Sequence, residues 1–294
     1  ATAAAAVFTK ILSIVLPVFG LVLVGYLYAR RHRPDMTAAS RVNLDVFTPA
    51  LIFHVLAGRD FHPTDYLALA LGGVLVVLGS GAVAWGLSRT LHRDFRTLGP
   101  PLMFNNSGNM GLPLAVLAFG EAALPAAVVL FMVENLLHFT LGVRILDREA
   151  GLSSLLRMPL VLACLLGLAV SLLRIPIPLP VAQGIELLGQ VAIPLMLFSL
   201  GVRLMEANLD HWGIGLLGAL ARPLSGLLVA LAVLPFLGLT EALPRQLILF
   251  SVLPPAVLNY IVAERYGQEP ETVAAIVIWG NLASLAVIPL TLAA

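Results

Sequence analysis

The amino-acid sequence predicts an all-α membrane protein with ten transmembrane helices, arranged as two inverted five-helix repeats. Three observations predict this fold class. Of the 294 residues, 60% are hydrophobic and 11% are charged, whereas soluble domains carry roughly 25% charged residues. The chain divides into ten apolar segments, most of them near the ~20 residues needed to cross a bilayer. Unusual polar motifs also recur at a roughly constant spacing along the chain.

The composition excludes several classes of function. A net charge of +1 offers no basic surface for nucleic acid. Cys164 is the single cysteine, so a disulfide within the chain and a cysteine-based metal site are excluded. The sequence has no phosphate-binding P-loop, no paired-histidine zinc motif and no convincing nucleophilic triad. We therefore expect no enzyme, no metal and no cofactor, with the lipid bilayer as the surrounding partner.

Ten segments have the length and apolarity of membrane-crossing helices. The second is the shortest, and it carries Asn43, Asp45 and His54. Connections are short, so any function must be performed within the membrane. The expected spans lie near residues 8–29, 42–58, 66–90, 97–119, 122–145, 155–173, 180–204, 212–238, 243–263 and 271–293.

Lysine and arginine are distributed unevenly over the connections between the spans. One set of alternate connections holds twelve of these residues, whereas the opposite set and the termini together hold four. Basic residues are retained on the cytoplasmic side of a membrane. Both termini are therefore expected outside the cytoplasm, in a bacterial-type inner (plasma) membrane.

The fourth span is interrupted at its centre by the polar stretch 105–113 (NNSGNMGLP). Three amides, two glycines and a proline facing lipid would leave backbone and side-chain dipoles without partners. Such a segment persists where a helix is broken and lines a polar cavity. Secondary transporters build substrate sites from broken helices of this kind.

Features of the first half recur in the second half at a spacing of about 146 residues. The matched features are residues 46–53 with 191–198, Phe104 with Phe250 ahead of the two breaks, and Asn135 with Asn281. We therefore expect two repeats, 1–146 and 147–294. Five spans per repeat is an odd number, which inverts the second repeat. The broken fourth and ninth spans would then cross near the bilayer midplane.

The half-helix ends at this crossing would point backbone N–H groups and positive dipole ends at a ligand, which favours an anion. Asn106 and Asn259 are the leading substrate ligands, because a neutral amide donates to a carboxylate without adding charge. Alternatively, both amides cap backbone groups that the breaks leave free. Four more candidates accompany them, the prolines chiefly shaping the backbone: Asn105, Asn109, Pro254 and Pro255.

Five further polar residues are candidates for ion coupling or for a polar core. Glu134 lies mid-span, beside Asn135 and one helical turn from His138, and an ionisable residue at this depth indicates function. The Glu134–His138 pair could exchange a proton, bind a cation or form a structural contact. Arg222 could serve an anion, pair with Glu134 or extend to the cytoplasmic interface. Asn281, in the tenth span, completes the set.

Motifs at both breaks resemble the auxin efflux carrier family, which includes plant PIN-FORMED proteins and bacterial malonate-type permeases. The resemblance covers nearly the whole chain and implies the fold shared with bile acid–sodium symporters. The residues that carry it are 106–114 (NSGNMGLPL), 253–259 (LPPAVLN), 16–26 (LPVFGLVLVGY) and 49–53 (PALIF).

The resemblance further implies a transport domain of spans 3–5 and 8–10 that moves against a dimerising scaffold of spans 1, 2, 6 and 7. By motif position, Asn106 matches the family's substrate-binding asparagine, and Pro254 matches its proline in the second break. The long cytoplasmic loop of plant members is absent. Sodium-coupled relatives carry an acidic residue at the ninth-span crossing, where this chain has Pro254-Pro255, so a sodium site is not expected.

We therefore expect a secondary transporter of small organic anions, mono- or dicarboxylates, that works as a homodimer by elevator-type alternating access. Two modes of coupling stay open: proton coupling through Glu134, and uniport with Glu134 in a structural role. A membrane receptor or regulatory subunit that binds a ligand without moving it is the second hypothesis. A channel, which would conduct without saturation, is the third.

Overall fold

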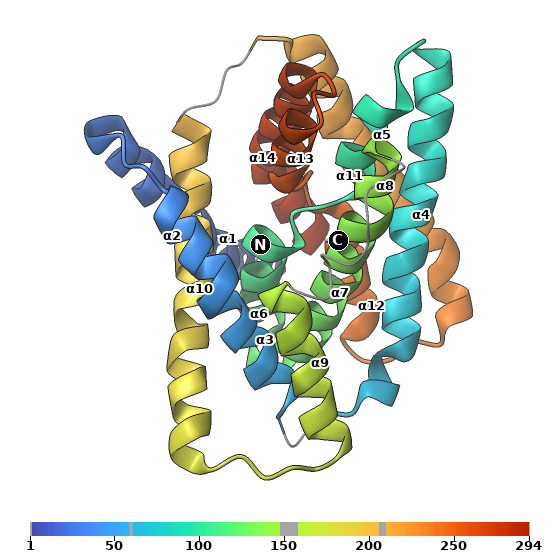
Figure 1. Cartoon of the computed structure of the whole chain (residues 1–294). Helices are drawn as coiled ribbons and strands as arrows, with labels where there is room; N and C mark the ends of the chain where they lie inside the picture. Colours follow the sequence, from blue (N-terminus) through green and yellow to red (C-terminus); the bar gives the residue numbers. More distant parts are fainter. Residues whose placement is uncertain (1, 59–60, 148–157, 206–209, 294) are drawn as a thin grey trace.

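The computed structural model describes residues 2–58, 61–147, 158–205 and 210–293 (Figure 1). These residues are helical apart from their connections and one isolated bridge, which confirms the predicted all-α class. The predicted boundary between the repeats is followed by residues 148–157, which lie outside the described residues. Helical stretches long and apolar enough to cross a membrane are Pro63–Thr90, Glu121–Leu146, Leu179–Met205, Trp212–Leu237 and Pro270–Ala293.

Each predicted span coincides with one or more helices within the described residues. Single helices occupy the first, third, sixth, seventh, eighth and tenth: α1 Thr2–His32, α4 Leu67–Thr90, α9 Pro159–Leu172, α10 Leu179–Met205, α11 Trp212–Leu237 and α14 Pro270–Ala293. The second comprises α2 Thr37–Val42, η1 Asn43–Phe47 and α3 Thr48–Leu56. The fourth comprises α5 Phe95–Met103, η3 Ser107–Gly111 and α6 Leu112–Phe119, and the ninth α12 Leu243–Val252 and α13 Leu258–Arg265. The fifth comprises α7 Leu124–Leu137, η5 His138–Gly142 and α8 Val143–Leu146, with short turns η2 Pro63–Tyr66 and η4 Glu121–Ala123 ahead of α4 and α7.

The second span begins earlier than predicted, at Thr37 instead of residue 42. Oδ1 of Asp35 accepts a hydrogen bond from the Thr37 backbone N–H at 2.8 Å, which satisfies one of the free N–H groups at a helix start. Hydrogen bonds from Thr37 also hold the pKa of Asp35 below its usual value. Asp35 is therefore ionised at neutral pH.

Both broken helices stop at a residue whose backbone leaves the helical region. α5 ends at Met103, and Phe104 has the extended backbone angles φ −99° and ψ 116°. α12 ends at Val252, and Leu253 has ψ 145°, because a residue that precedes a proline is displaced from the helical region. In Figure 1, α5 and α13 lie above the breaks, whereas α6 and α12 lie below them. The two interrupted helices therefore run in opposite directions.

The two extended segments pair with each other in the middle of the molecule. Asn105 and Pro255 form an isolated antiparallel bridge. The Asn106 backbone N–H donates to the Pro254 carbonyl at 2.7 Å, and the Ala256 N–H donates to the Phe104 carbonyl at 3.0 Å. Unpaired backbone groups cannot be left at bilayer depth. Each break thus supplies the hydrogen-bond partners that the other lacks.

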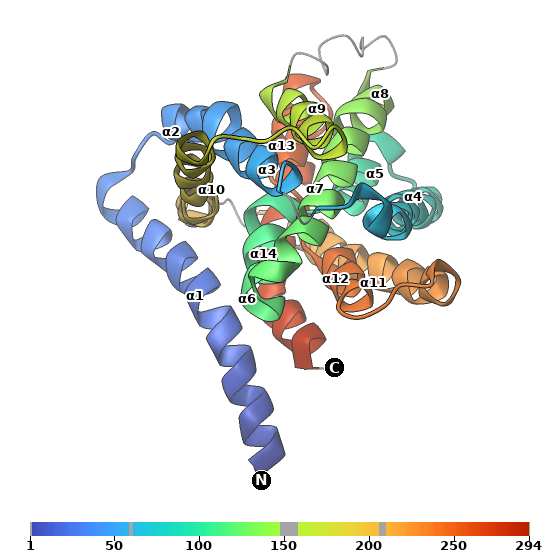
Figure 2. The same ribbon diagram turned by 90° about the horizontal axis from the view of Figure 1, so that it is seen from below.

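Glycines allow the helices to approach closely, as small residues do between membrane helices. A Cβ atom on Gly201 of α10 would overlap the carbonyl oxygen of Val22 in α1. α3 packs against α9 and α10, while α11 packs against α4 and α14. Figure 2 shows α1 projecting from the rest of the chain, with its first turns far from the other helices.

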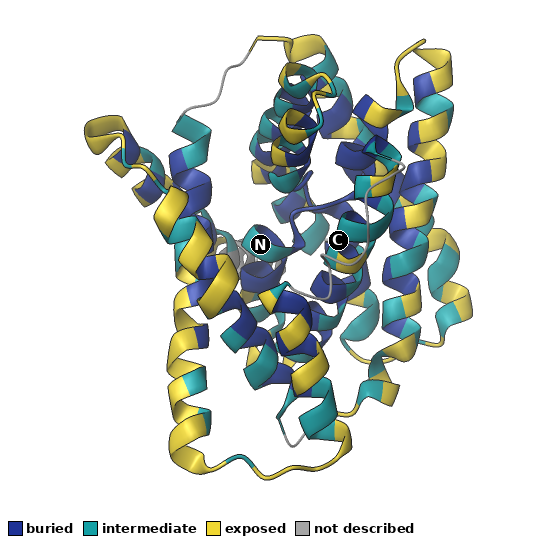
Figure 3. Ribbon diagram, viewed as in Figure 1, coloured by how far each residue is buried: buried dark blue, intermediate teal, exposed yellow. Residues whose placement is uncertain are grey.

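Burial is concentrated where the helices surround the two breaks (Figure 3). Residues 104–106 and 253–256 are all buried. The outer helices instead expose large apolar side chains, such as Leu172 of α9, Leu187 of α10 and Leu228 of α11. Such a surface would be unfavourable in water, but a lipid bilayer solvates it. The distribution of apolar side chains therefore agrees with a membrane environment.

Candidate functional site

Two asparagines connect the breaks by reciprocal hydrogen bonds, each from a side-chain amide to a backbone carbonyl of the other half. Nδ2 of Asn105 donates to the carbonyl of Phe250 at 2.8 Å, and Nδ2 of Asn259 donates to the carbonyl of Phe104 at 2.9 Å. Asn259 also donates to the carbonyl of Ala256 at 3.0 Å, so both of its N–H groups are used. In this structure Asn259 therefore caps backbone groups, the alternative role predicted from sequence.

Asn106 makes a different contact, with a side chain of the tenth span. Its Nδ2 donates to Oδ1 of Asn281 at 3.0 Å. Nδ2 of Asn281 donates to the carbonyls of Pro255 and Val277 at 3.1 and 2.8 Å, which fixes the direction of the Asn281 amide. A carboxamide has two N–H donors, and the contact with Asn281 uses one of those on Asn106. The structure thus brings together Asn106 and Asn281, two of the predicted site residues.

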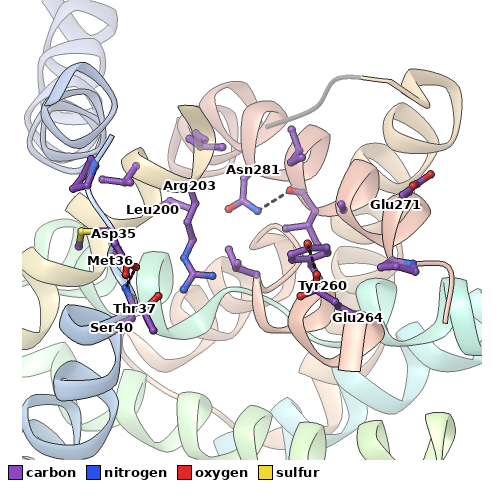
Figure 4. Close-up of a pocket in the computed structure, with 18 of the residues that line it drawn as sticks. Asp35, Met36, Thr37, Ser40, Leu200, Arg203, Tyr260, Glu264, Glu271 and Asn281 are labelled. Atoms are coloured by element: carbon purple, nitrogen blue, oxygen red, sulfur yellow. Dashed lines mark hydrogen bonds between the residues drawn. The ribbon is translucent and has the colours of Figure 1, made fainter. Parts of the chain in front are cut away.

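A cavity of about 820 Å³ reaches Asn281 from one end of the molecule. It lies between the α1–α2 connection with α2 and α10 on one side and α13 with α14 on the other (Figure 4). Its walls carry both acidic and basic side chains. Among the lining residues are Asp35, Thr37, Ser40, Arg203, Tyr260, Glu264 and Glu271.

The sequence analysis did not select Arg203 or Tyr260 as site residues. Arg203 counted only as one basic residue at the end of a span, and Tyr260 directly follows the candidate Asn259. In the structure Arg203 is half-buried in the last turn of α10 and extends into the cavity in Figure 4. The sequence signal for Arg203 was only its place as a basic residue at the end of a span, which does not show that a cavity lies beside it.

Glu134 and His138 form a buried pair beside the crossing. Oε1 of Glu134 lies 3.3 Å from Nδ1 of His138, close enough for an ion pair if the imidazole is protonated. Oε2 of Glu134 accepts a hydrogen bond from the hydroxyl of Ser107 at 3.2 Å. The His138 ring stacks on Phe104, with 4.3 Å between ring centroids. The pair is therefore attached to the first break through both Ser107 and Phe104.

Arg222 is fully buried, so the prediction that it extends to the cytoplasmic interface is wrong. Nη1 of Arg222 donates to the carbonyl of Ser251 at 3.1 Å, at the C-terminal end of α12, where a positive charge is favoured. Gly226 makes room, because a Cβ atom there would overlap the same carbonyl oxygen. Glu134 interacts with the guanidinium electrostatically, although no direct ion pair joins the two among the described residues.

The remaining candidates have more local roles in the structure. Nδ2 of Asn135 donates to the carbonyl of Phe131 in its own helix at 2.8 Å, and among the described contacts it makes no hydrogen bond to either break. Asn109 is half-buried in η3. Pro254 and Pro255 are buried, and their carbonyls accept hydrogen bonds from Asn106 and Asn281. In this structure the prolines contribute carbonyl acceptors to the breaks.

A comparison with known proteins now places this arrangement in a family. The sequence model of a family described as "Membrane transport protein" matches residues 10–154 and 149–292. The chain belongs to this family. The match confirms the resemblance to auxin efflux carriers and identifies the chain as a multi-pass membrane transport protein.

One curated relative aligns over nearly the whole chain. It is a protein of Rhizobium meliloti (strain 1021) that bears the name "Putative malonate transporter". It is 27% identical over 304 residues, which cover 95% of this chain and 94% of the relative. The similarity therefore extends over nearly the full length of both chains.

The reciprocal asparagine contacts give a prediction for stability. Asn259→Ala leaves the Phe104 carbonyl with one hydrogen bond fewer in a buried position, so the free energy of unfolding should fall by about 1–3 kcal/mol. Asn109→Ala is the matched control, because Asn109 is half-buried, and it should change stability by less. Thermal unfolding in detergent measures both variants. Equal melting temperatures for the two variants would show that the reciprocal contacts do not stabilise the fold.

Proposed function

We propose that the chain is a secondary transporter of small organic anions, specifically carboxylates. The observation that carries this proposal is the cavity of about 820 Å³ that reaches Asn281, the residue that holds Asn106 at the paired breaks. Small-molecule sites have volumes of roughly 300–1,000 Å³, so a dicarboxylate with some water fits. The contact with Asn281 uses one N–H of the Asn106 amide, so the second N–H can donate to a carboxylate.

Among the described residues, the cavity holds one arginine, Arg203, among several carboxylates, so an anion would be bound by a few positioned donor groups and not by a basic surface. Arg203 supplies a positive charge on one wall, and Asn281 and Tyr260 supply neutral polar groups on the walls formed by α14 and α13. Several carboxylates line the outer part, among them Glu271, whose Oε2 lies 3.7 Å from Nε2 of the exposed His211. The name of the relative favours dicarboxylates such as malonate as the substrate class.

Packing between the two halves supports an inverted repeat. α1 of the first half packs along α10 of the second, and α9 of the second packs along α3 of the first. The two broken helices run in opposite directions and exchange hydrogen bonds. Repeats 1–146 and 147–294, related by inversion, account for all of these contacts. This is the ten-span arrangement that we propose.

The position of the cavity supports elevator-type alternating access. One group of helices comprises α1, α2, α3, α9 and α10, and the other comprises α4 to α8 with α11 to α14. The cavity has walls from both groups, so movement of the second group against the first would carry the crossing across the membrane. We propose that the first group is the scaffold, and that it forms the homodimer.

The same end of the molecule holds the cavity and most of the basic connections. In Figure 1 the α4–α5 and α13–α14 connections lie at the top, whereas the α9–α10 and α11–α12 connections lie lower. The upper connections carry the arginines that predict a cytoplasmic location. The proposal therefore places both termini outside the cytoplasm, with the cavity open to the cytoplasm in this conformation.

Proton coupling is the mode of transport that the buried Glu134 supports. His138 on the same helix and Arg222 from α11 are the basic groups that act on it. Gain or loss of a proton by Glu134 would change the charge that faces the crossing and the Ser107 hydrogen bond. Elements packed against α7 contribute four other ionisable side chains. His54 is half-buried, and the other three are exposed: Arg89, Glu121 and Arg245.

Substrate binding tests the site. Asn106→Ala removes a hydrogen bond to a charged ligand, worth about 1.5–3 kcal/mol, so affinity for malonate should fall roughly ten- to a hundredfold. Asn135→Ala is the matched control, because that amide bonds only its own helix among the described contacts. Thermal shift and counterflow of labelled malonate in proteoliposomes measure binding and transport. Wild-type affinity in Asn106→Ala would place the substrate elsewhere, and binding without counterflow in the wild type would indicate a receptor.

A separate experiment tests coupling. Glu134→Gln keeps the shape of the side chain but cannot ionise, so uptake should lose its dependence on a pH gradient while exchange of substrate continues. Initial rates in liposomes, with and without an imposed gradient, measure the two activities. A wild-type protein whose uptake ignores the gradient would instead indicate uniport, with Glu134 as a structural support for the first break.

A further inference from the structure

A second, much smaller cavity lies on the other side of the crossing from the large one. Its volume is about 20 Å³. A site needs about 10–15 Å³ to hold one water molecule, so this cavity has room for one. Its walls come from η3, α6, α7, α12 and Leu253. Two polar side chains, Ser107 and Gln246, line it among apolar neighbours.

Gln246 is a buried polar residue that neither the sequence analysis nor the proposed substrate site uses. Its side chain is 4% exposed, and its Oε1 has no hydrogen-bond partner among the described residues. An unsatisfied buried acceptor destabilises a fold by about 1–3 kcal/mol. Buried water molecules commonly bind such acceptors. Gln246 lies in the first turn of α12, next to the exposed Arg245.

Ser107 connects the small cavity to Glu134. Its hydroxyl donates to Oε2 of Glu134 at 3.2 Å, and a hydroxyl oxygen keeps two lone pairs that accept hydrogen bonds. A water molecule in the cavity would therefore donate one hydrogen to Gln246 Oε1 and the other to Ser107 Oγ. The water would donate to Ser107 and Ser107 donates to Glu134, so this chain of hydrogen bonds runs from the cavity to Glu134.

We propose that this cavity is a water site that carries protons between Glu134 and the non-cytoplasmic face, separately from the substrate cavity. The transfer consumes one proton from the non-cytoplasmic solution: a hydronium ion gives a proton to the water, the water gives a proton to Ser107 Oγ, and Ser107 gives its own proton to Glu134 Oε2. Only O–H bonds form and break. The inference rests on the proposed coupling role of Glu134.

This arrangement explains how Glu134 could exchange protons while the crossing is open to the cytoplasm. The large cavity reaches Asn281 from the end where α13 lies, whereas Gln246 lies in α12, on the opposite side of the breaks (Figure 1). Proton and substrate would approach the crossing from different sides. Gln246 is thus assigned as a positioning residue for the water.

Two variants test the water site by different means. Gln246→Met keeps the length of the side chain but removes its acceptor, and Ala127→Val fills the cavity, which Ala127 lines, without changing a polar group. Both should slow pH-gradient-driven uptake of labelled malonate at least tenfold while leaving counterflow without a gradient at the wild-type rate. Leu247→Met is the control, because Leu247 is buried in α12 but does not line the cavity.

The outcomes separate this inference from the proposed function. If the wild type responds to the gradient and both variants respond equally, the water site is wrong while proton coupling stands. If the wild type ignores the gradient, coupling and water site fall together. An experimental density map gives an independent readout: a peak within hydrogen-bond distance of Gln246 Oε1 and Ser107 Oγ is expected. An empty cavity in a map that resolves other buried waters would overturn the inference.

Discussion

The pairing of two extended segments at the centre of the molecule is the constraint on which the other features depend. A helix that stops inside a bilayer exposes carbonyl and N–H groups that lipid cannot satisfy. Here residues 104–106 and 253–256 satisfy each other, through backbone bonds and through the amides of Asn105 and Asn259. Neither break is stable without the other, so the two halves of the chain must fold around one shared centre.

The asparagines at this centre divide into two kinds. Asn105 and Asn259 bind backbone carbonyls across the crossing, which holds the breaks together. Asn106 and Asn281 bind each other, and Asn281 also lines the large cavity. A substrate that replaced part of the Asn106–Asn281 contact would therefore bind the crossing without removing the bonds that hold it. This separation lets one structure be both rigid and accessible, which the proposed alternating access would require.

The sequence predicted the breaks because amides, glycines and prolines cannot continue a lipid-facing helix, and that argument needs no knowledge of tertiary contacts. It could not predict which face of a span turns inward. Asn135 was matched to Asn281, yet the residue that faces the crossing is its neighbour Glu134, a shift of one residue that turns a side chain by about 100° on a helix. For Arg222 the sequence left an anion site, a pair with Glu134 and the interface all open, because burial of a guanidinium depends on partners such as the Ser251 carbonyl. Arg203 and Gln246 were missed because cavities form between elements distant in sequence.

The central claim is that a small carboxylate binds in the large cavity against the amide of Asn106. An experimental structure of the protein saturated with malonate tests this claim most directly. The account predicts ligand density between Asn106, Asn281 and Arg203, with the Asn105 and Asn259 bonds across the breaks intact. Malonate density at another site, or a crossing unchanged and unoccupied at a concentration that saturates binding, would contradict it.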